Sequence, residues 1–179
     1  MTKSQIRNKI LLRLKTQKEE DRSKKSKIIK ERLFRSLFFK KAKAIMFYLS
    51  FDGEVNTKEM IKEAQKIGKI VAVPVCQRNR IIKPARLTKK AKLKKGPYGI
   101  CEPAVKRFMN GKDLDLVIVP GVAFDRQGNR LGRGKGHYDY FLKKIFKRTT
   151  SVGLAFDFQI LSFLPTTKRD TSVDRIIFA

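Results

Sequence analysis

The sequence predicts one α/β domain in which helices cover both faces of a mainly parallel sheet. Three observations lead to this fold class. Short, continuously apolar runs such as Ala44–Leu49 are typical of strands buried on both faces. Segments with apolar residues three or four apart lie between these runs and indicate helices. The 179 residues, 41% of them hydrophobic, contain no linker or internal repeat, so we expect residues 1–179 to form a single domain.

The N-terminal region predicts a pair of helices with strongly basic outer faces. Ile6 and Ile10 begin a series of apolar residues four apart, which favours a helix over residues 3–15. A polar break at residues 17–25 separates it from a second apolar series, which favours a helix over residues 26–40.

A change of pattern after Lys43 predicts a βαβ unit. The buried strand at residues 44–49 is followed by a polar loop at 50–56, and a helix is expected from about residue 57 to 67. The apolar run Ile70–Val75 then predicts a second strand, parallel to the first.

The rest of the chain continues this alternation, which favours a Rossmann-like arrangement of three layers. Ligands of such sheets bind beyond the carboxyl ends of the strands, so we expect a site formed by residues 50–56, 120–136 and the segment after Phe156. In chain order, the patterns predict a short strand at 80–82, a turn at 96–99, a short helix at 104–110, a strand at 116–119, a long loop at 122–135, a helix that carries Tyr138, Phe141, Leu142, Ile145 and Phe146, and strands at 151–156 and 173–178.

The net charge of +27 indicates a positive surface that attracts anions. Nucleic acid, a nucleotide and a polyglutamylated cofactor are all suitable anions, and net charge does not distinguish among them. Residues 78–95 carry nine basic and no acidic side chains. Basic clusters of this kind are usually solvated faces, so they are weak support for nucleic-acid binding.

Composition also limits where in the cell the protein is expected and which metal sites it can form. Frequent charges in the first residues exclude the apolar core of a signal peptide, and the longest apolar runs are too short to span a bilayer. We therefore expect a cytoplasmic protein without a membrane segment. Cys76 and Cys101 form no CxxC pair, and His137 is the only histidine, so we expect reduced thiols and no common zinc site.

The segment from Arg130 to Asp139 carries the strongest chemical signal. Three glycines alternate with cationic side chains, after a predicted strand and just before a predicted helix. Without Cβ atoms, backbone N–H groups can approach phosphate oxygens, and the start of the helix adds further N–H donors. Arg130, Arg133 and Lys135 supply positive charge for a phosphoryl group. The spacing matches neither a P-loop nor GxGxxG, so a flexible basic surface loop is the alternative interpretation.

Three acids and one histidine complete the candidates. Asp139 is placed to bind Mg²⁺ beside phosphates, or only to stabilise the start of the helix. Glu54 follows a buried strand on the expected binding side, where it can accept hydrogen bonds from a heterocycle or merely offset local positive charge. On position alone, Asp170 is a solvated charge and His137 is a packing residue.

These segments resemble the signature of the 5-formyltetrahydrofolate cyclo-ligases, also called methenyltetrahydrofolate synthetases. The runs Val119–Asp125 and Gly128–Gly136 and the pair Tyr138-Asp139 carry the resemblance. The chain departs from the family pattern at His137, where Tyr or Phe is more common, and in having no Trp. Other blocks agree in order, so that the resemblance covers essentially the whole chain: Lys3 with Arg7, Tyr48-Leu49 with Glu54-Val55 and Thr57, Gly99-Ile100 with Glu102-Pro103, Val152–Phe156, Gln159, Pro165, Asp170 and Val173-Asp174.

The resemblance implies an ATP- and Mg²⁺-dependent enzyme that closes 5-formyltetrahydrofolate to 5,10-methenyltetrahydrofolate and releases ADP and phosphate. In that reaction the formyl oxygen attacks the γ-phosphate, and N10 then displaces phosphate from the resulting imino-phosphate. Such chemistry asks the protein mainly for positioning and charge neutralisation, so no nucleophilic side chain is needed. The excess positive charge would suit a polyglutamylated folate. We expect a monomer with no specific nucleic-acid partner.

The resemblance also implies roles for individual residues. Asp139 and Asp170 hold Mg²⁺, and Arg133 and Lys135 act catalytically by stabilising the phosphoryl oxygens. The implied folate contacts are Leu49, Glu54, Arg133, Gly134, Lys135, Gly136 and His137. The implied ATP contacts are Lys3, Arg7, Arg130, Leu131, Gly132, Arg133, Gly134, Lys135, Gly136, His137 and Tyr138.

Two other classes of function stay open at this point. A basic nucleic-acid-binding protein would account for the charge of +27. However, the aromatic residues lie mostly on apolar helix faces rather than among Lys and Arg, and no zinc-finger, RNP or KH signature is present. A sugar-phosphate isomerase or a CoA-transferase-like enzyme would account for the anion-binding loop, but not for the other blocks.

Overall fold

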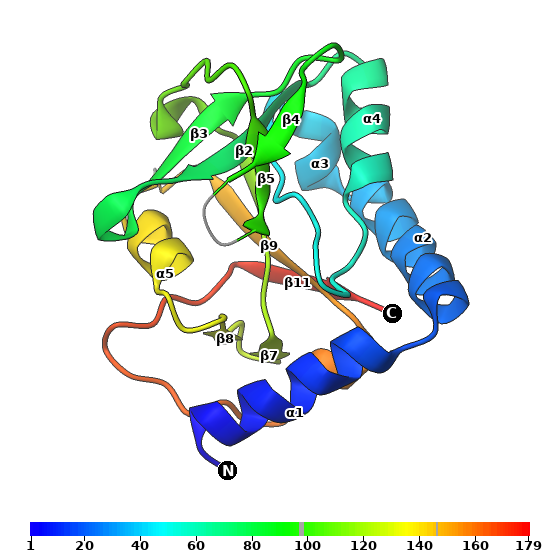
Figure 1. Cartoon of the computed structure of the whole chain (residues 1–179), viewed down its shortest axis with the longest axis vertical. Coiled ribbons are helices and arrows are strands. Elements are labelled where there is room, and N and C mark those ends of the chain that lie inside the picture. The colour runs from blue at the N-terminus through cyan, green and yellow to red at the C-terminus, as the bar shows by residue number, and fades with distance from the viewer. Residues whose placement is uncertain (97–98, 146) are drawn as a thin grey trace.

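A six-stranded sheet forms the centre of the protein, whose computed structural model describes residues 1–96, 99–145 and 147–179 (Figure 1). The strands lie in the order β11-β9-β6-β1-β2-β3. All neighbours are parallel except β3, which pairs antiparallel with β2. The prediction of a mainly parallel sheet is confirmed. The strands are β1 (Ala44–Met46), β2 (Ile70–Cys76), β3 (Ile82–Arg86), β6 (Leu116–Val119), β9 (Thr150–Ala155) and β11 (Arg175–Phe178).

The inner strands of this sheet are buried on both faces, which explains their continuously apolar sequences. Successive side chains of a strand point to opposite faces. Accordingly, Ile45 packs into one hydrophobic cluster and Met46 into the other. Every residue of β1 and β6 is buried.

Helices cover both faces, as the sequence predicts. Ile6, Ile29, Phe39 and Met60, from α1 to α4 respectively, belong to the core on one face, whereas Phe141 of α5 belongs to the core on the other. Figure 1 shows α2, α3 and α4 on one side of the sheet and α5 on the opposite side. The helices are α1 (Lys3–Thr16), α2 (Glu19–Arg35), α3 (Leu37–Lys41), α4 (Lys58–Lys66) and α5 (His137–Leu142), with 3-10 turns η1 (Arg78–Arg80), η3 (Gly111–Asp113) and η4 (Asp157–Gln159).

The N-terminal helical pair is present, but its boundaries differ from the prediction. α2 begins at Glu19, so the polar break expected at residues 17–25 is mostly helix. The acidic first turn favours this start because it faces the positive end of the helix dipole, and the polar Ser26 lies buried on the packed face. The helix expected at 26–40 is divided at Ser36, whose side chain caps α3.

The segment expected to be one long loop at 122–135 contains a short hairpin. β7 and β8 pair antiparallel, and β10 adds a third, parallel strand beside β7. Fully buried Asp125 closes the turn, since its carboxylate accepts N–H groups of Gln127 and Asn129 at 3.1 and 3.0 Å. These strands are too short to show an alternating pattern. The minor strands are β4 (Leu93–Lys95), β5 (Cys101–Pro103), β7 (Ala123–Asp125), β8 (Arg130–Leu131) and β10 (Ile160–Leu161).

The prediction of a helix at 104–110 is wrong. The chain bends at residues 104–105, and residues 107–109 then pair with β3, as the bond from the Met109 N–H to the Pro84 carbonyl at 2.9 Å shows. The hairpin of β4 and β5 was not predicted. The strand expected at 80–82 is displaced to Ile82–Arg86.

Two expected features fall partly outside the described residues. The turn at 96–99 includes Pro97 and Tyr98, and the helix that follows the glycine loop was expected to carry Phe146; these three residues lie outside the described part of the chain.

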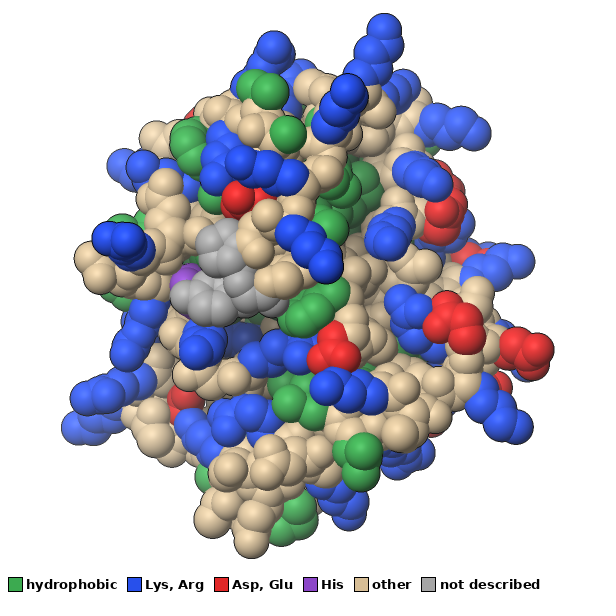
Figure 2. Space-filling model, in the orientation of Figure 1, with side chains coloured by type: hydrophobic (Ala, Val, Ile, Leu, Met, Phe, Trp, Pro, Cys, Tyr) green, Lys and Arg blue, Asp and Glu red, His purple; other side chains and the backbone are tan. Residues whose placement is uncertain are grey.

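Lys and Arg side chains are spread over the whole visible face of the molecule in Figure 2. They are not gathered into one stripe on this face, as an extended binding surface for nucleic acid would require. In the described segments of the chain, no helix combines the length and the apolar composition needed to cross a bilayer.

Candidate active site

A cavity of about 280 Å³ opens beyond the carboxyl ends of β1, β2 and β6, where the sheet topology predicts a site. Two of the three predicted segments, 50–56 and 120–136, contribute to its wall. The segment after Phe156 reaches it only indirectly, through contacts to Asp139. The lining residues are Tyr48, Leu49, Phe51, Glu54, Pro74, Cys76, Ile100, Pro120, Gly121, Val122, Arg130, Gly132, Arg133, Lys135, Gly136, His137, Tyr138 and Asp139.

The glycine loop, residues 130–136, has backbone conformations that favour glycine. Gly134 and Gly136 have φ angles of 96° and 70°, which lie in the left-handed region that other residues rarely adopt. Arg7 of α1 packs beside Gly134, and its Nε donates to the Gly132 carbonyl oxygen at 3.0 Å. The structure therefore places Arg7 against the loop, as expected for two parts of one anion site.

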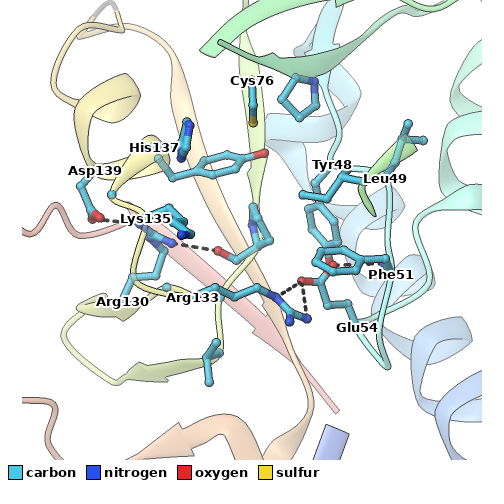
Figure 3. Close-up of a pocket in the computed structure, with 18 residues that line it drawn as sticks. Tyr48, Leu49, Phe51, Glu54, Cys76, Arg130, Arg133, Lys135, His137 and Asp139 are labelled. Atoms are coloured by element: carbon cyan, nitrogen blue, oxygen red, sulfur yellow. Dashed lines mark hydrogen bonds and ion pairs between the residues drawn. The ribbon is translucent and has the colours of Figure 1, made fainter. Parts of the chain in front are cut away.

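Arg133 extends from the glycine loop across the cavity to the loop after β1 (Figure 3). Its guanidinium donates to Asp52 Oδ2 at 2.9 Å and to Glu54 Oε1 at 3.4 Å. Its Cζ lies 4.2 Å from the centre of the Phe51 ring. Arg133 thus connects the candidate phosphate-binding loop with the candidate folate-binding loop.

Glu54 is a buried carboxyl group with a raised pKa. Its residue is only 7% exposed. Burial raises its pKa from 4.5 to about 7, and Arg133 offsets this effect only in part. A carboxyl group in this state changes charge near neutral pH, which is typical of functional sites.

We expect Glu54 to make the stability of the protein depend on pH. Because the pKa of Glu54 is higher in the folded than in the unfolded state, its stabilising contribution is complete below pH 4.5 and is lost as the pH rises through about 7. With about 1.4 kcal/mol per pKa unit, the loss amounts to about 3 kcal/mol. Denaturant titrations at about pH 5 and about pH 8 should show this loss in the wild type but not in Glu54→Gln. Equal pH dependence in both proteins would contradict the assignment.

Arg130 and Asp139 form an ion pair at one end of the cavity, where α5 forms the wall (Figure 3). Arg130 NH2 donates to Asp139 Oδ1 at 2.8 Å, and NH1 donates to the Pro120 carbonyl oxygen at 3.2 Å. The Arg130 side chain is 4% exposed. At this burial the guanidinium depends on Asp139 for charge compensation, so Asp139 has a structural role whatever else it binds.

Asp170 lies outside the cavity wall but close to the same end. Its carboxylate pairs with Lys3 of α1, and the next residue, Thr171, donates from Oγ1 to the Asp139 carbonyl oxygen at 3.1 Å. Burial raises the pKa of Asp170, but hydrogen bonds from Lys3 and Thr167 outweigh this effect and hold the pKa below its usual value. Each predicted metal ligand is therefore paired with a cation, Asp139 with Arg130 and Asp170 with Lys3.

Most of the residues implied by the resemblance line the cavity, and a few do not. Leu131 is buried in the core behind the loop. Lys3, Arg7, Gly134 and Asp170 lie outside the wall. The implied residues on the wall are Leu49, Glu54, Arg130, Gly132, Arg133, Lys135, Gly136, His137, Tyr138 and Asp139.

Sequence reasoning missed Asp52 and Cys76, which help to shape the site, and it did not foresee the environment of Tyr138, which was expected as an ATP contact. Asp52 contacts Arg133, and only its place next to the loop acid Glu54 could have indicated this. The Tyr138 hydroxyl is buried and has no hydrogen-bond partner among the described residues. Burial raises the pKa of this phenol, so it stays protonated and can donate to a ligand. Half-buried Cys76 lines the cavity, but burial raises the pKa of its thiol, which disfavours a nucleophilic role.

Comparisons with known proteins agree with this arrangement. Residues 1–179 match the model of the 5-formyltetrahydrofolate cyclo-ligase family. A 5-formyltetrahydrofolate cyclo-ligase of Mus musculus is 31% identical over 97% of this chain and 91% of its own. The corresponding enzyme of Haemophilus influenzae is 35% identical over 77% of this chain and 76% of its own.

Solved structures show the same fold. The 5,10-methenyltetrahydrofolate synthetase of Aquifex aeolicus superposes with a TM-score of 0.88 at 35% identity, over 99% of this chain and 90% of the other. A synthetase of Mycoplasma pneumoniae gives a TM-score of 0.81 at 22% identity, over 99% and 98% of the two chains, which supports the fold alone. Because the family model matches its full length and a solved synthetase shares its fold, the chain is an enzyme that belongs to the 5-formyltetrahydrofolate cyclo-ligase family.

Proposed function

We propose that this enzyme uses ATP and Mg²⁺ to close 5-formyltetrahydrofolate to 5,10-methenyltetrahydrofolate, with release of ADP and phosphate. The observation that carries the proposal is the reach of Arg133 from the glycine loop to Glu54, at 3.4 Å. One cation thus lies between a loop suited to phosphate and a carboxyl group suited to a heterocycle. The reaction needs such a junction because the phosphoryl group passes from the nucleotide to the folate.

The folate is proposed to bind against the loop after β1. Glu54 would accept hydrogen bonds from N–H groups of the pterin ring, while Leu49 and Phe51 supply apolar surface on the same wall. The buried hydroxyl of Tyr138 is a further donor for a polar atom of the substrate. Residues 133–137 would contact the folate from the opposite side.

ATP is proposed to lie along the glycine loop, where backbone N–H groups and the nearby Arg7 can bind phosphate oxygens. The carboxylates of Asp139 and Asp170 fit Mg²⁺, which typically takes one or two carboxylates together with phosphate oxygens. Among the described residues, no three acids, histidines or cysteines are grouped, so the phosphates would have to complete the coordination. When bound, Mg²⁺ would neutralise phosphate charge.

The proposed chemistry has two steps. The formyl oxygen attacks the γ-phosphorus; an O–P bond forms and the bond from that phosphorus to the ADP oxygen breaks. N10 then attacks the activated formyl carbon, and a C–N bond forms that closes the ring. The bond between this carbon and the phosphorylated oxygen breaks, so that phosphate leaves, and N10 loses its proton. Arg133 and Lys135 are proposed to offset the charge of the phosphoryl oxygens in both steps, because preorganised cations lower the energy of such transition states.

A single assay tests this function. Purified protein is mixed with 5-formyltetrahydrofolate, ATP and Mg²⁺, and the absorbance of the methenyl product is followed together with ADP release. Product should form only when all three are present, with one ADP per product. Conversion without ATP, or ATP hydrolysis without conversion, would overturn the proposal.

We expect Glu54→Gln to weaken folate binding while ATP binding is nearly unchanged. The amide has the same shape but cannot accept hydrogen bonds at both atoms of the carboxylate, and a lost hydrogen bond to a charged group corresponds to roughly 10-fold or more in affinity. Because the pKa of Glu54 is about 7, wild-type folate affinity should also rise with pH through neutrality, whereas that of the variant should not. Calorimetric titrations with each ligand alone measure both effects. Equal losses for the two ligands would remove Glu54 from the folate site.

A further inference from the structure

We propose that Asp52 is a positioning residue for this reaction: it keeps the Arg133 guanidinium in place when Glu54 leaves that guanidinium to bind the folate. The inference rests on the proposed roles of Arg133 and Glu54. Asp52 does not line the cavity and has no role in the ligand sets assigned above.

The contacts of Arg133 are unequal. Arg133 NH1 lies 2.9 Å from Asp52 Oδ2, which is a normal charge-assisted hydrogen bond. Its Nε and NH2 both lie 3.4 Å from Glu54 Oε1, at the outer limit for such bonds. Phe51 packs against the guanidinium, 4.2 Å from Cζ to the ring centre. Asp52 and Phe51 therefore hold Arg133 more firmly than Glu54 does.

The loop that carries Asp52 is fixed by the N-terminal helices. Asp52 and Gly53 both have left-handed backbone conformations, with φ of 51° and 81°. A Cβ atom at Gly53 would lie 2.0 Å from the Leu14 carbonyl oxygen, so only glycine fits against α1 there. Gln17 Nε2 donates to the Gly53 carbonyl oxygen at 2.8 Å, and Arg22 Nε donates to that of Glu54 at 3.0 Å. Asp52 is thus presented on a rigid support.

The balance of charges explains why a second carboxylate is useful. If Glu54 alone paired with Arg133, binding of the folate to Glu54 would have to break that ion pair and release a flexible cation. With Asp52 present, Arg133 keeps its shortest contact while Glu54 becomes free to accept hydrogen bonds from the folate. A catalytic cation that stays ordered needs no reorganisation when the phosphoryl group arrives.

The same geometry predicts how Asp52 acts on the protonation of Glu54. Without Asp52, a negative neighbour is removed and Arg133 turns more fully to Glu54, and both changes lower the pKa of Glu54. The charged and titratable groups that face this pair, directly or through Asp52, are Arg133, Lys15, Arg22, Tyr48 and Tyr138.

The test compares Asp52→Asn, the conservative Asp52→Glu and the matched control Asp157→Asn, which removes an aspartate paired with Lys25 outside the cavity. Folate affinity is measured calorimetrically without ATP across a pH series, and thermal melting verifies the fold. Asp52→Asn should bind folate on the order of tenfold more weakly, since groups in one network couple at this level. The midpoint of the pH dependence of folate affinity should move to lower pH in Asp52→Asn. Asp52→Glu should restore both the affinity and this midpoint toward the wild-type values.

Three results would overturn the proposal. The first is an Asp52→Asn variant with the folate affinity and the pH midpoint of the wild type. The second is an equal loss of folate affinity in Asp52→Glu and Asp157→Asn, and the third is a loss in Asp52→Asn that stays as large in an Arg133→Ala background. The last result would show that Asp52 acts on the loop and not through Arg133. Failure of the underlying assignment looks different: in that case Glu54→Gln and Arg133→Ala themselves leave folate binding and turnover unchanged.

Discussion

Turnover of the Arg133→Ala variant should fall by about 10²–10³-fold, which is typical when one preorganised donor to the transition state is removed. The side chain contacts Asp52, Glu54 and Phe51 at the cavity and does not belong to either hydrophobic core. Its loss should therefore leave the melting temperature close to that of the wild type. Steady-state rates of methenyl formation measure the effect.

Two further variants sharpen this experiment. Arg133→Lys keeps the charge but loses the planar fork, so its turnover should lie between those of the wild type and the alanine variant. Arg126→Ala removes an exposed arginine from the turn between β7 and β8 and serves as the matched control. If Arg133→Ala turned over within a few-fold of Arg126→Ala, with normal stability, the glycine loop would have only a structural role.

Removal of divalent metal should abolish the reaction, and added Mg²⁺ should restore it. Asp139 and Asp170 are the carboxylates proposed to bind the ion, but they differ in what else they hold. Asp139 compensates the charge of Arg130, whose side chain is 4% exposed. Asp139→Asn should therefore also lower the free energy of unfolding by about 3–5 kcal/mol, as expected when one partner of a buried pair is lost.

Asp170→Asn separates metal binding from stability. Its carboxylate is 23% exposed and pairs with Lys3, so the expected loss of stability is at most about 1 kcal/mol. The Mg²⁺ concentration for half-maximal rate should nevertheless rise on the order of tenfold, given the loss of one carboxylate ligand. Full activity of the wild type in excess chelator, or unchanged Mg²⁺ dependence in Asp170→Asn, would contradict the metal assignment.

The central sheet could be predicted because its inner strands are buried on both faces and are therefore continuously apolar. Elements whose signal is not hydrophobic were less predictable. The start of α2 at Glu19 depends on an acidic first turn, and the polar Ser26 on its packed face obscures the helical pattern. The non-helical conformation of residues 107–109 is fixed by hydrogen bonds to β3, which no local pattern reveals.

In the candidate site, too, some features could be predicted from the sequence and others depend on the fold. The glycine loop and Glu54 could be named as candidates from residue pattern and position, and the resemblance then implied their roles. The contact between Arg133 and Glu54, which are 79 residues apart, follows only from the folded topology. The raised pKa of Glu54 also depends on burial that no sequence pattern measures. The contact of Asp52 with Arg133 was not predicted because it depends on the conformation of the turn that presents Asp52.

The ion pair between Lys3 and Asp170 sets an order of events during protein synthesis. It joins positions 167 residues apart, so it can form only after almost all of the described chain has left the ribosome. Glu54 and Arg133, on the proposed folate wall, lie earlier in the sequence than Asp170. The proposed metal and nucleotide end, which includes Lys3 and Asp170, therefore cannot be complete before the segment that carries Asp170 has folded back onto α1.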